Sequence, residues 1–596
     1  MKYKYLVKMS RIFSVLFFTF IIFSNINLSI EKLEYTLDFE KTNWSFDETN
    51  GVYYQIGVVY CTNPTNTDYQ SFGIYVPKEY LTCTQSGDKY SCDINSSGKK
   101  DFFTASNAPI VMPVNTPGYA AMKAPTTYSY STVSEFMTKG IIYLYAGCRG
   151  RYDDSTDFIS GAPWPVTDLK SAIRYVRYNK NLIPGDKDKI YTFGMSGGGA
   201  QSCLMGVTGN SALFNKYLES NGAAMKDSDG NDIKDNVKGS QCWCPITNLD
   251  TADEAYEWNM GQYYSTNTRA EGTFTKLLSD DLTAEYVKYV NAIKLKDPKG
   301  NVLTLSNTNE GTYYDFLKSI IEESLNNFFK DTTFPYTPDV RPGPGPFPPQ
   351  TESELGVTYN NISEYIAAKN NGTEWLLYDE TTKKASITSV GDFVKNCKNA
   401  KKNVAAFDDL NYGQAENRVF GTSTTEKVKH FDQIISELLN TNKEKYAEKS
   451  DWKDTYPDDY LNDFGDQDSM GNNVTTRLNI YNPMYYLIDY YGGKDTSDVA
   501  DYFRINTGLF QSDTGNVVEM NLYLALLNYG KDVEFTTVWE KEHVEAERTG
   551  TSTANFISWV TEIEKGGDTD DTTDNNFSNI INMSYFLYLL SLLILF

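Results

Sequence analysis

The sequence predicts an α/β fold in which a mostly parallel sheet carries helices on both faces and is interrupted by a large, mainly helical insertion. Short apolar runs alternate with helical segments between residues 51 and 250, which is typical of parallel strands joined by crossover helices. This alternation is lost over residues 251–474 and returns over residues 475–565. A chain of 596 residues also exceeds what one hydrophobic core usually holds, so we expect two packed units.

Each expected strand is an apolar run of β type, and each expected helix has apolar residues at helical spacing. In the helix that follows Pro165, for example, Leu169, Ile173 and Val176 fall near one face, which would cover a sheet. The expected strands span residues 51–61, 70–77, 108–114, 140–148, 189–194, 501–510 and 532–539, and the late helices span 517–530 and 551–565. The insertion contains expected helices at 275–293 and 312–329 and a stiff, proline-rich excursion at 334–350.

Both ends of the chain have the composition of targeting segments. A basic stretch precedes the apolar run 12–23, which predicts a signal peptide over residues 1–29, with an uncleaved membrane anchor as the alternative. Residues 566–596 form a polar spacer and a terminal apolar tail, which predict a GPI anchor, with a tail helix left in the membrane as the alternative. Either way we expect a secreted, surface-attached protein that touches a membrane only through this anchor.

The composition agrees with a secreted protein and excludes one class of partner. The net charge of −24 argues against nucleic acid, because phosphate binding needs a basic surface. An oxidising compartment would let the cysteines pair, and two of them, Cys83 and Cys92, are close enough to close one loop, whereas Cys203 is expected on a helix as a buried thiol. The cysteines are Cys61, Cys83, Cys92, Cys148, Cys203, Cys242, Cys244 and Cys397. Glycosylation sequons occur at Asn43, Asn95, Asn361, Asn371 and Asn473.

The stretch "YTFGMSGGGAQS" contains a candidate nucleophile. Gly194, Ser196 and Gly198 match the pattern G-x-S-x-G, and the match lies between the expected strand "KIYTFG" and the helical "AQSCLMGV". A serine at such a strand-to-helix turn needs small neighbours, because the turn is tight and because the backbone N–H after the serine must approach an oxyanion. We therefore identify Ser196 as the nucleophile of a hydrolase and the Gly197 N–H as an oxyanion donor. A structural glycine turn is the alternative.

Only two histidines are available to activate this serine. His430 lies in "TTEKVKHFDQIISELLNT", an expected amphipathic helix of the insertion, where a solvent-facing or packing role is expected. His543 follows the expected last strand, which is where an α/β-hydrolase carries its base, and an exposed residue of a charged loop is the alternative. Asp513 is the only acid between the preceding strand and the next helix, so the order Ser196, Asp513, His543 matches that fold, although a turn-capping aspartate is the alternative.

At these residues the chain resembles the bacterial-type (subtype B) tannases, serine esterases of α/β-hydrolase fold with a large lid. The resemblance covers most of residues 50–260 and 395–565. It is carried by "GCRGR", "DLKSAIRYVRYNKNLIPGDKDKIYTFGMSGGGAQS", "CPITNLDTADEAYEWN", "AAFDDLNYGQAENRVFG", "NPMYYL", "FRINTG", "QSDT" and "DVEFTTVWEKEHVEAERTG". A series of dispersed blocks in the family's order is more specific than one pentapeptide.

The resemblance implies attack by Ser196 on a galloyl-type ester, with His543 as base and then acid. It implies a second oxyanion amide from the loop "PVNTPGYAA", for which Gly118 is the candidate. By motif position, it also assigns the binding of phenolic hydroxyls to Lys402, Glu416 and Asp513. Without the resemblance, Lys402 and Glu416 would be interpreted as surface charges of the insertion. No metal or other cofactor is implied, and the expected partner is a small ester or a plant polyphenol.

Two departures from the family pattern affect the site. The family has D-x-D-T where this chain has Gln511-Ser512-Asp513-Thr514, so the triad acid aligns with Gln511 and Asp513 aligns with the substrate-binding aspartate. Either Asp513 orients the histidine, or an amide does so in a slower enzyme. Fungal-type tannases flank the serine and histidine with disulfide-bonded cysteines, whereas Met195 and Val544 occupy those places here.

The sequence therefore predicts a secreted serine carboxylesterase that acts on aromatic acid esters. A feruloyl, hydroxycinnamoyl or acetyl ester hydrolase on the same scaffold is one alternative. A catalytically silent binding or adhesion protein is the other, and fold alone does not separate them.

Overall fold

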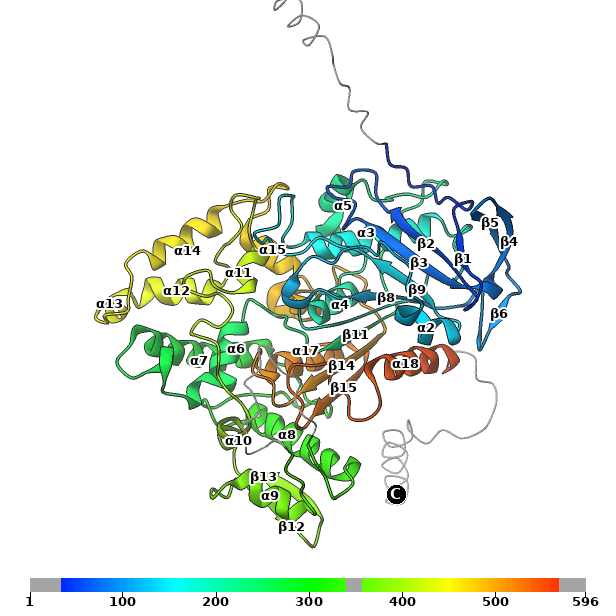
Figure 1. Ribbon diagram of the computed structural model, residues 1–596. Coiled ribbons are helices and arrows are strands. Elements are labelled where there is room, and N and C mark those ends of the chain that lie inside the picture. The colour runs from blue at the N-terminus through cyan, green and yellow to red at the C-terminus, as the bar shows by residue number, and fades with distance from the viewer. Residues whose placement is uncertain (1–33, 339–355, 567–596) are drawn as a thin grey trace, which may run out of the picture.

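The computed structural model describes residues 34–338 and 356–566, and in these residues one large sheet crosses the molecule (Figure 1). Its strand order is β1-β2-β3-β9-β8-β10-β11-β14-β15. The first pairings, from β1 to β9, are antiparallel, and every pairing from β9 onward is parallel. The strands are β1 (Ser45–Asp47), β2 (Val52–Val59), β3 (Ser71–Pro77), β8 (Ile110–Val114), β9 (Ile142–Ala146), β10 (Ile190–Met195), β11 (Gly239–Trp243), β14 (Tyr502–Gly508) and β15 (Asp532–Val538).

Helices cover both faces of this sheet. On one face α2 (Tyr130–Thr138) and α18 (Ser552–Gly566) lie against each other, and Phe193 of β10 packs between Phe136 and Phe556 with ring centroids 5.9 and 4.4 Å away. The other face carries α4 (Gly197–Val207), which contacts α3 (Trp164–Tyr178), and α17 (Asn516–Tyr529). Every strand expected from the sequence is present, and the predicted α/β-hydrolase architecture is confirmed.

The chain leaves the sheet after β11 and re-enters it at β14, so the insertion lies between two neighbouring strands. It has its own apolar core, built around Phe274, Leu278, Ile435 and Tyr460. Its hairpin is β12 (Leu376–Asp379) with β13 (Lys384–Ile387), and its helices are α6 (Ala252–Asn259), α7 (Phe274–Ile293), α8 (Thr312–Asp331), α9 (Ile362–Asn370), α10 (Val390–Cys397), α11 (Ala415–Val419), α12 (Gln433–Thr441), α13 (Lys443–Ala447), α14 (Tyr456–Gly465), α15 (Val474–Ile480) and α16 (Pro483–Leu487). Figure 1 shows these helices gathered to one side of the sheet.

The predicted helix around His430 is wrong at its start. The helix α12 begins only at Gln433, because the Asp432 side chain accepts the Ile435 N–H and caps it there. His430 therefore lies in the preceding loop and is buried. Of the proline-rich excursion 334–350, the structure describes only residues 334–338.

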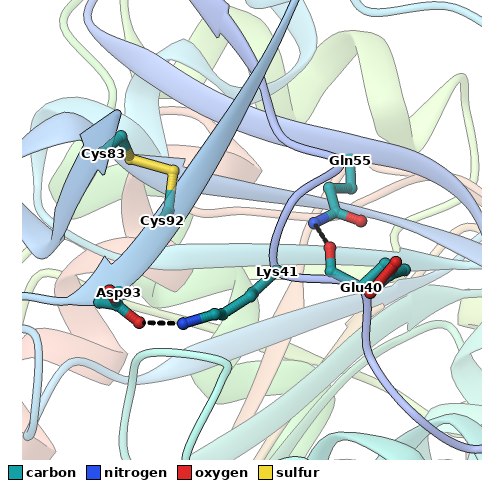
Figure 2. The surroundings of a disulfide bond; sticks show 6 residues. All are labelled: Glu40, Lys41, Gln55, Cys83, Cys92 and Asp93. Carbon is teal, nitrogen blue, oxygen red and sulfur yellow. Dashed lines mark hydrogen bonds and ion pairs between the residues drawn. A yellow bond between two sulfur atoms is a disulfide. The ribbon is translucent and has the colours of Figure 1, made fainter. Parts of the chain in front are cut away.

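A disulfide joins Cys83 and Cys92 across the hairpin of β4 (Leu81–Ser86) and β5 (Lys89–Ile94), as Figure 2 shows. The Lys41 ammonium lies 2.6 Å from Asp93 Oδ1, so the segment that precedes β1 is held to the same hairpin. The expectation of wider cysteine pairing is wrong for the thiols in the core, since Cys61, Cys148, Cys203, Cys242 and Cys244 are buried and not disulfide-bonded. Among them Cys203 lies on α4, as expected.

The predicted signal peptide and GPI-type tail lie outside the described residues, except for Gly566. Within residues 34–338 and 356–566, no helix is both long and apolar enough to cross a bilayer.

Candidate active site

Ser196 occupies a strained turn between β10 and α4. Its φ of 61° and ψ of −125° are rarely adopted by residues other than glycine, and its N–H donates to the Trp243 carbonyl at 2.9 Å. The flanking glycines are required by space: a Cβ at Gly194 would lie 2.5 Å from the Gly198 oxygen, and one at Gly198 would lie 2.1 Å from the Val114 oxygen. The turn thus places the serine hydroxyl beyond the carboxyl ends of the parallel strands, outside the sheet.

His543 lies beside this serine although 347 residues separate them. It follows β15, and its Nε2 lies 2.8 Å from Ser196 Oγ, with both residues less than a tenth exposed. Burial lowers the pKa of His543 to about 4; the charge of Asp513 opposes this shift, and those of Lys402 and Lys401 add to it. The imidazole is therefore neutral at neutral pH and has a lone pair available to accept the serine proton.

Gln511 stands behind His543, with its Oε1 2.8 Å from Nδ1. The expectation that Asp513 takes this place is corrected by the structure. After β14 the Phe510 N–H donates to the Lys541 carbonyl at 2.9 Å and the Gln511 N–H donates to the Gly508 carbonyl at 3.3 Å, and this tight turn directs Gln511 toward the histidine. Asp513, two residues later, instead forms an ion pair with Lys401 at 3.1 Å.

Two buried charged residues of this region were missed by sequence reasoning. Glu519 of α17 accepts the Gln511 amide at 2.6 Å, and burial raises its pKa to about 7, which the Lys398 charge opposes. Lys398 donates to the Gln511 carbonyl at 2.6 Å, and burial lowers its pKa to about 7. A signal for Glu519 was present, since it is the only charged residue in "NVVEMNLYLALLNY". Lys398 gave no such signal, because it lies among other lysines in "KNCKNAKKN".

The two candidate oxyanion glycines come from adjacent backbones. A Cβ on Gly197 would lie 2.5 Å from the Tyr119 nitrogen and 2.8 Å from the Thr116 oxygen, so the start of α4 touches the short helix η2 (Pro117–Tyr119). Gly197 is the first residue of α4, where amide groups have no partner within the helix and face outward. Gly118 adopts a φ of +54° in η2, which suits a residue without a Cβ.

The solved structures that are similar to this chain include tannases. Fusobacterium nucleatum tannase matches with 25% identity and a TM-score of 0.65, over 89% of this chain and all of that chain. Lactobacillus plantarum tannase matches with 22% identity and a TM-score of 0.64, over 89% of this chain and 100% of that chain. A tannin acyl hydrolase in complex with ethyl gallate matches with 24% identity and a TM-score of 0.63, over 88% of this chain and 98% of that chain. This chain has a tannase-like α/β-hydrolase fold.

A comparison with family models and one with curated sequences complete this result. The family model BD-FAE matches residues 103–297, which include Ser196 and both candidate oxyanion glycines. No curated protein sequence matches significantly. The tannase-like fold and the serine–histidine contact together support an esterase.

The tannase-like fold brings two further predicted residues, Lys402 and Glu416, toward this site. The Lys402 ammonium lies 3.7 Å from the centroid of the Phe407 ring, and its charge acts on His543. Glu416 of α11 is buried, and its charge helps to raise the pKa of Tyr119 beside the oxyanion loop, where burial is the main cause. Lys401, the residue before Lys402, is the lysine that contacts Asp513.

His430 is not part of this arrangement. Its ring is buried between Tyr412 and Tyr460, with centroids 4.0 and 3.8 Å away, and its Nδ1 lies 2.7 Å from Asp408 Oδ1. His543 is therefore the histidine that contacts Ser196. The described part of the chain contains no cluster of three or more acidic, cysteine or histidine side chains suited to a metal ion.

Proposed function

We propose that this chain is a serine carboxylic-ester hydrolase that cleaves esters of galloyl-type phenolic acids through an acyl-enzyme. The observation that carries the proposal is the 2.8 Å contact between Ser196 Oγ and a neutral His543 at a strained strand-to-helix turn. The substrate class is supported by the similar solved structures, described as tannases and as a tannin acyl hydrolase bound to ethyl gallate or 3,4-dihydroxybenzoate.

In the acylation step, His543 Nε2 takes the serine proton while Ser196 Oγ forms a bond to the ester carbonyl carbon. The carbonyl oxygen gains negative charge, which the Gly197 N–H and an amide of the Gly118 loop stabilise. The bond to the alcohol oxygen then breaks, and the imidazolium returns its proton to that oxygen. The products of this step are the free alcohol and an ester between Ser196 and the aromatic acid.

In the deacylation step, water replaces the alcohol. His543 takes one proton from the attacking water, the water oxygen bonds to the acyl carbon, and the same amides hold the new oxyanion. The bond to Ser196 Oγ breaks, the serine recovers its proton from the imidazolium, and the aromatic acid leaves. Throughout both steps Gln511 Oε1 accepts the Nδ1–H of His543.

Charged groups of the insertion suit a phenol ring. A buried carboxylate such as Glu416 accepts hydrogen bonds from phenolic hydroxyls, and the ammonium of Lys402 and the Asp513–Lys401 pair offer both a donor and an acceptor nearby. A substrate without the hydroxyls would leave these groups unpaired in a partly buried site, so such a substrate is rejected.

The substitution Ser196→Ala tests the nucleophile. It should abolish turnover of methyl gallate and labelling by an organophosphonate, while the circular dichroism spectrum stays unchanged. Full turnover by this variant would refute the proposal. Comparing methyl gallate with methyl ferulate and a phenyl acetate then distinguishes the alternatives, because a hydroxycinnamoyl or acetyl esterase prefers the latter two and a silent binding protein hydrolyses none.

We further propose that the protein is exported and attached to a cell surface. The Cys83–Cys92 disulfide and the exposed sequons at Asn43, Asn361 and Asn371 are compatible with a secretory route. Expression of the full chain in eukaryotic cells, followed by phospholipase C treatment, tests the anchor. Activity should move from the cell surface to the medium, and activity that stays in the cytosol would exclude this route.

A further inference from the structure

The side-chain amide of Gln511 must be oriented correctly to support His543, whereas a carboxylate in the same place would accept from either end. A glutamine side chain offers an acceptor at one end and a donor at the other. If the amide were reversed, its NH₂ would donate to Nδ1, the ring proton would move to Nε2, and His543 could no longer accept the proton of Ser196. Catalysis therefore depends on which way the amide points.

Two buried side chains determine this direction. Glu519 Oε1 lies 2.6 Å from Gln511 Nε2, and when Glu519 is ionised its oxygens only accept, so ionised Glu519 holds the NH₂ group toward itself. The Thr507 hydroxyl lies 2.5 Å from the same nitrogen and donates to Glu519 Oε1 at 3.2 Å, which turns its lone pairs toward the amide. With the NH₂ held in this way, Oε1 faces Nδ1 at 2.8 Å.

The carboxylate also affects the hydrogen bond between Gln511 and the histidine. A hydrogen bond from an amide N–H to a carboxylate polarises the amide and makes its oxygen a stronger acceptor. Such an acceptor stabilises the imidazolium that forms during catalysis. Glu519 is fully buried in the first turn of α17, where the helix dipole favours a negative charge, and Lys398 supplies a positive charge nearby.

We propose that Glu519 is a positioning residue that takes the place of the missing triad carboxylate and acts on His543 through the side-chain amide of Gln511. This inference rests on the proposed function. One chain of hydrogen bonds runs from the nucleophile to a buried carboxylate, through Ser196, His543, Gln511 and Glu519.

Three variants of the full chain test this role. Glu519→Gln removes the charge and lets the Gln511 amide reverse, so kcat should fall by about 10²–10⁴-fold with little change in KM. The double variant Gln511→Glu, Glu519→Gln moves the carboxylate from position 519 to position 511, directly beside His543. It should restore kcat to within about tenfold of the original enzyme. Glu564→Gln is the control, because Glu564 is a buried acid paired with Lys189 and Lys238. These lysines directly precede β10 and β11, at the end of the strands opposite to Ser196.

A spectroscopic readout separates this inference from the proposed function. The chain has only two histidines, so the ¹⁵N resonances of His543 are assigned by comparison with a His543→Gln variant. In the original protein Nδ1 should carry the proton, and in Glu519→Gln the Nε2 tautomer should appear. Unchanged tautomer and unchanged kcat in Glu519→Gln, or no recovery in a folded double variant, would overturn the role of Glu519. Turnover retained by Ser196→Ala would instead refute the esterase, whatever the tautomer shows.

Discussion

The Asp513 carboxylate lies 3.1 Å from the Lys401 ammonium, so the loop that follows β14 is tied to the insertion by an ion pair. This pairing directs Asp513 away from the Nδ1 of His543, where Gln511 stands. A carboxylate that remains near the histidine without touching it still influences the ring, since the charge of Asp513 opposes the lowering of the His543 pKa by burial. The contact of Gln511 with His543 and the ion pair of Asp513 with Lys401 are thus linked. The position of Asp513 is suited to substrate binding.

The substitution Asp513→Asn separates these roles. If Asp513 contacts the substrate, KM for methyl gallate should rise by about tenfold while kcat changes by less than about threefold. A triad acid would give a loss in kcat of about 10⁴-fold. Both partners are partly exposed, so the lost ion pair should cost less than about 1 kcal/mol of stability. Steady-state kinetics and thermal unfolding of the variant measure both effects, with Asp495→Asn as the control, because Asp495 is exposed and its side chain accepts a hydrogen bond from the Tyr529 hydroxyl.

The low pKa of His543 predicts an unusual pH profile. Because the neutral imidazole is the base, kcat/KM should rise with pH around a midpoint of about 4, and a second rise near pH 7 should follow as Glu519 loses its proton. The groups that act on the ring are Asp513, which raises its pKa, and Lys402 and Lys401, which lower it. Measurements with an ester that does not ionise in this range test the profile. A profile without the rise near pH 4 would contradict a buried neutral base.

The same pKa affects stability. Between pH 4 and 6.5, the ordinary pKa of a histidine, the unfolded chain binds a proton at His543 that the folded chain does not bind. Stability therefore falls as the pH decreases through this window, by about 3 kcal/mol from this residue alone. In a His543→Gln variant this contribution should be absent, so urea unfolding at pH 4.5 and 7 should give a smaller difference in free energy than in the original protein.

The sequence predicted those parts of the fold and site that depend on local pattern. The turn around Ser196 was predictable because steric limits allow only glycine at Gly194 and Gly198, and both glycines can be recognised in the sequence. The place of His543 followed from chain order after the last strand. The family resemblance aligned Gln511 with the triad acid, but the sequence left the choice between Gln511 and Asp513 open, because it depends on backbone hydrogen bonds such as that from Phe510 to Lys541. Glu519 was missed because its role requires contacts from other elements.

Removal of the Cys83–Cys92 disulfide should lower stability without changing catalysis. The bond closes a short loop at the hairpin β4–β5, which forms its own two-stranded sheet beside β1 and, in Figure 1, lies apart from α4, the helix that Ser196 precedes. We expect the double variant Cys83→Ser, Cys92→Ser to lose about 2–3 kcal/mol of stability and to keep its kcat. Thermal unfolding with and without a reducing agent provides the measurement, and a reductant that also abolishes activity would contradict this separation.

The two oxyanion glycines should respond differently to alanine. At Gly197 a new Cβ would lie 2.5 Å from the Tyr119 nitrogen, so the start of α4 and the loop η2 must separate. That shift displaces both oxyanion amides, and we expect Gly197→Ala to reduce kcat by about 10²–10³-fold. At Gly118 the nearest neighbour of a new Cβ is Arg151 Nη1, 3.7 Å away, so space is available and only the φ of +54° opposes the change. Gly118→Ala should therefore cost about 1 kcal/mol of stability and reduce kcat by less than about tenfold. Equal losses of kcat in both variants would show that backbone conformation at Gly118, and not contact between the two backbones, limits the oxyanion site.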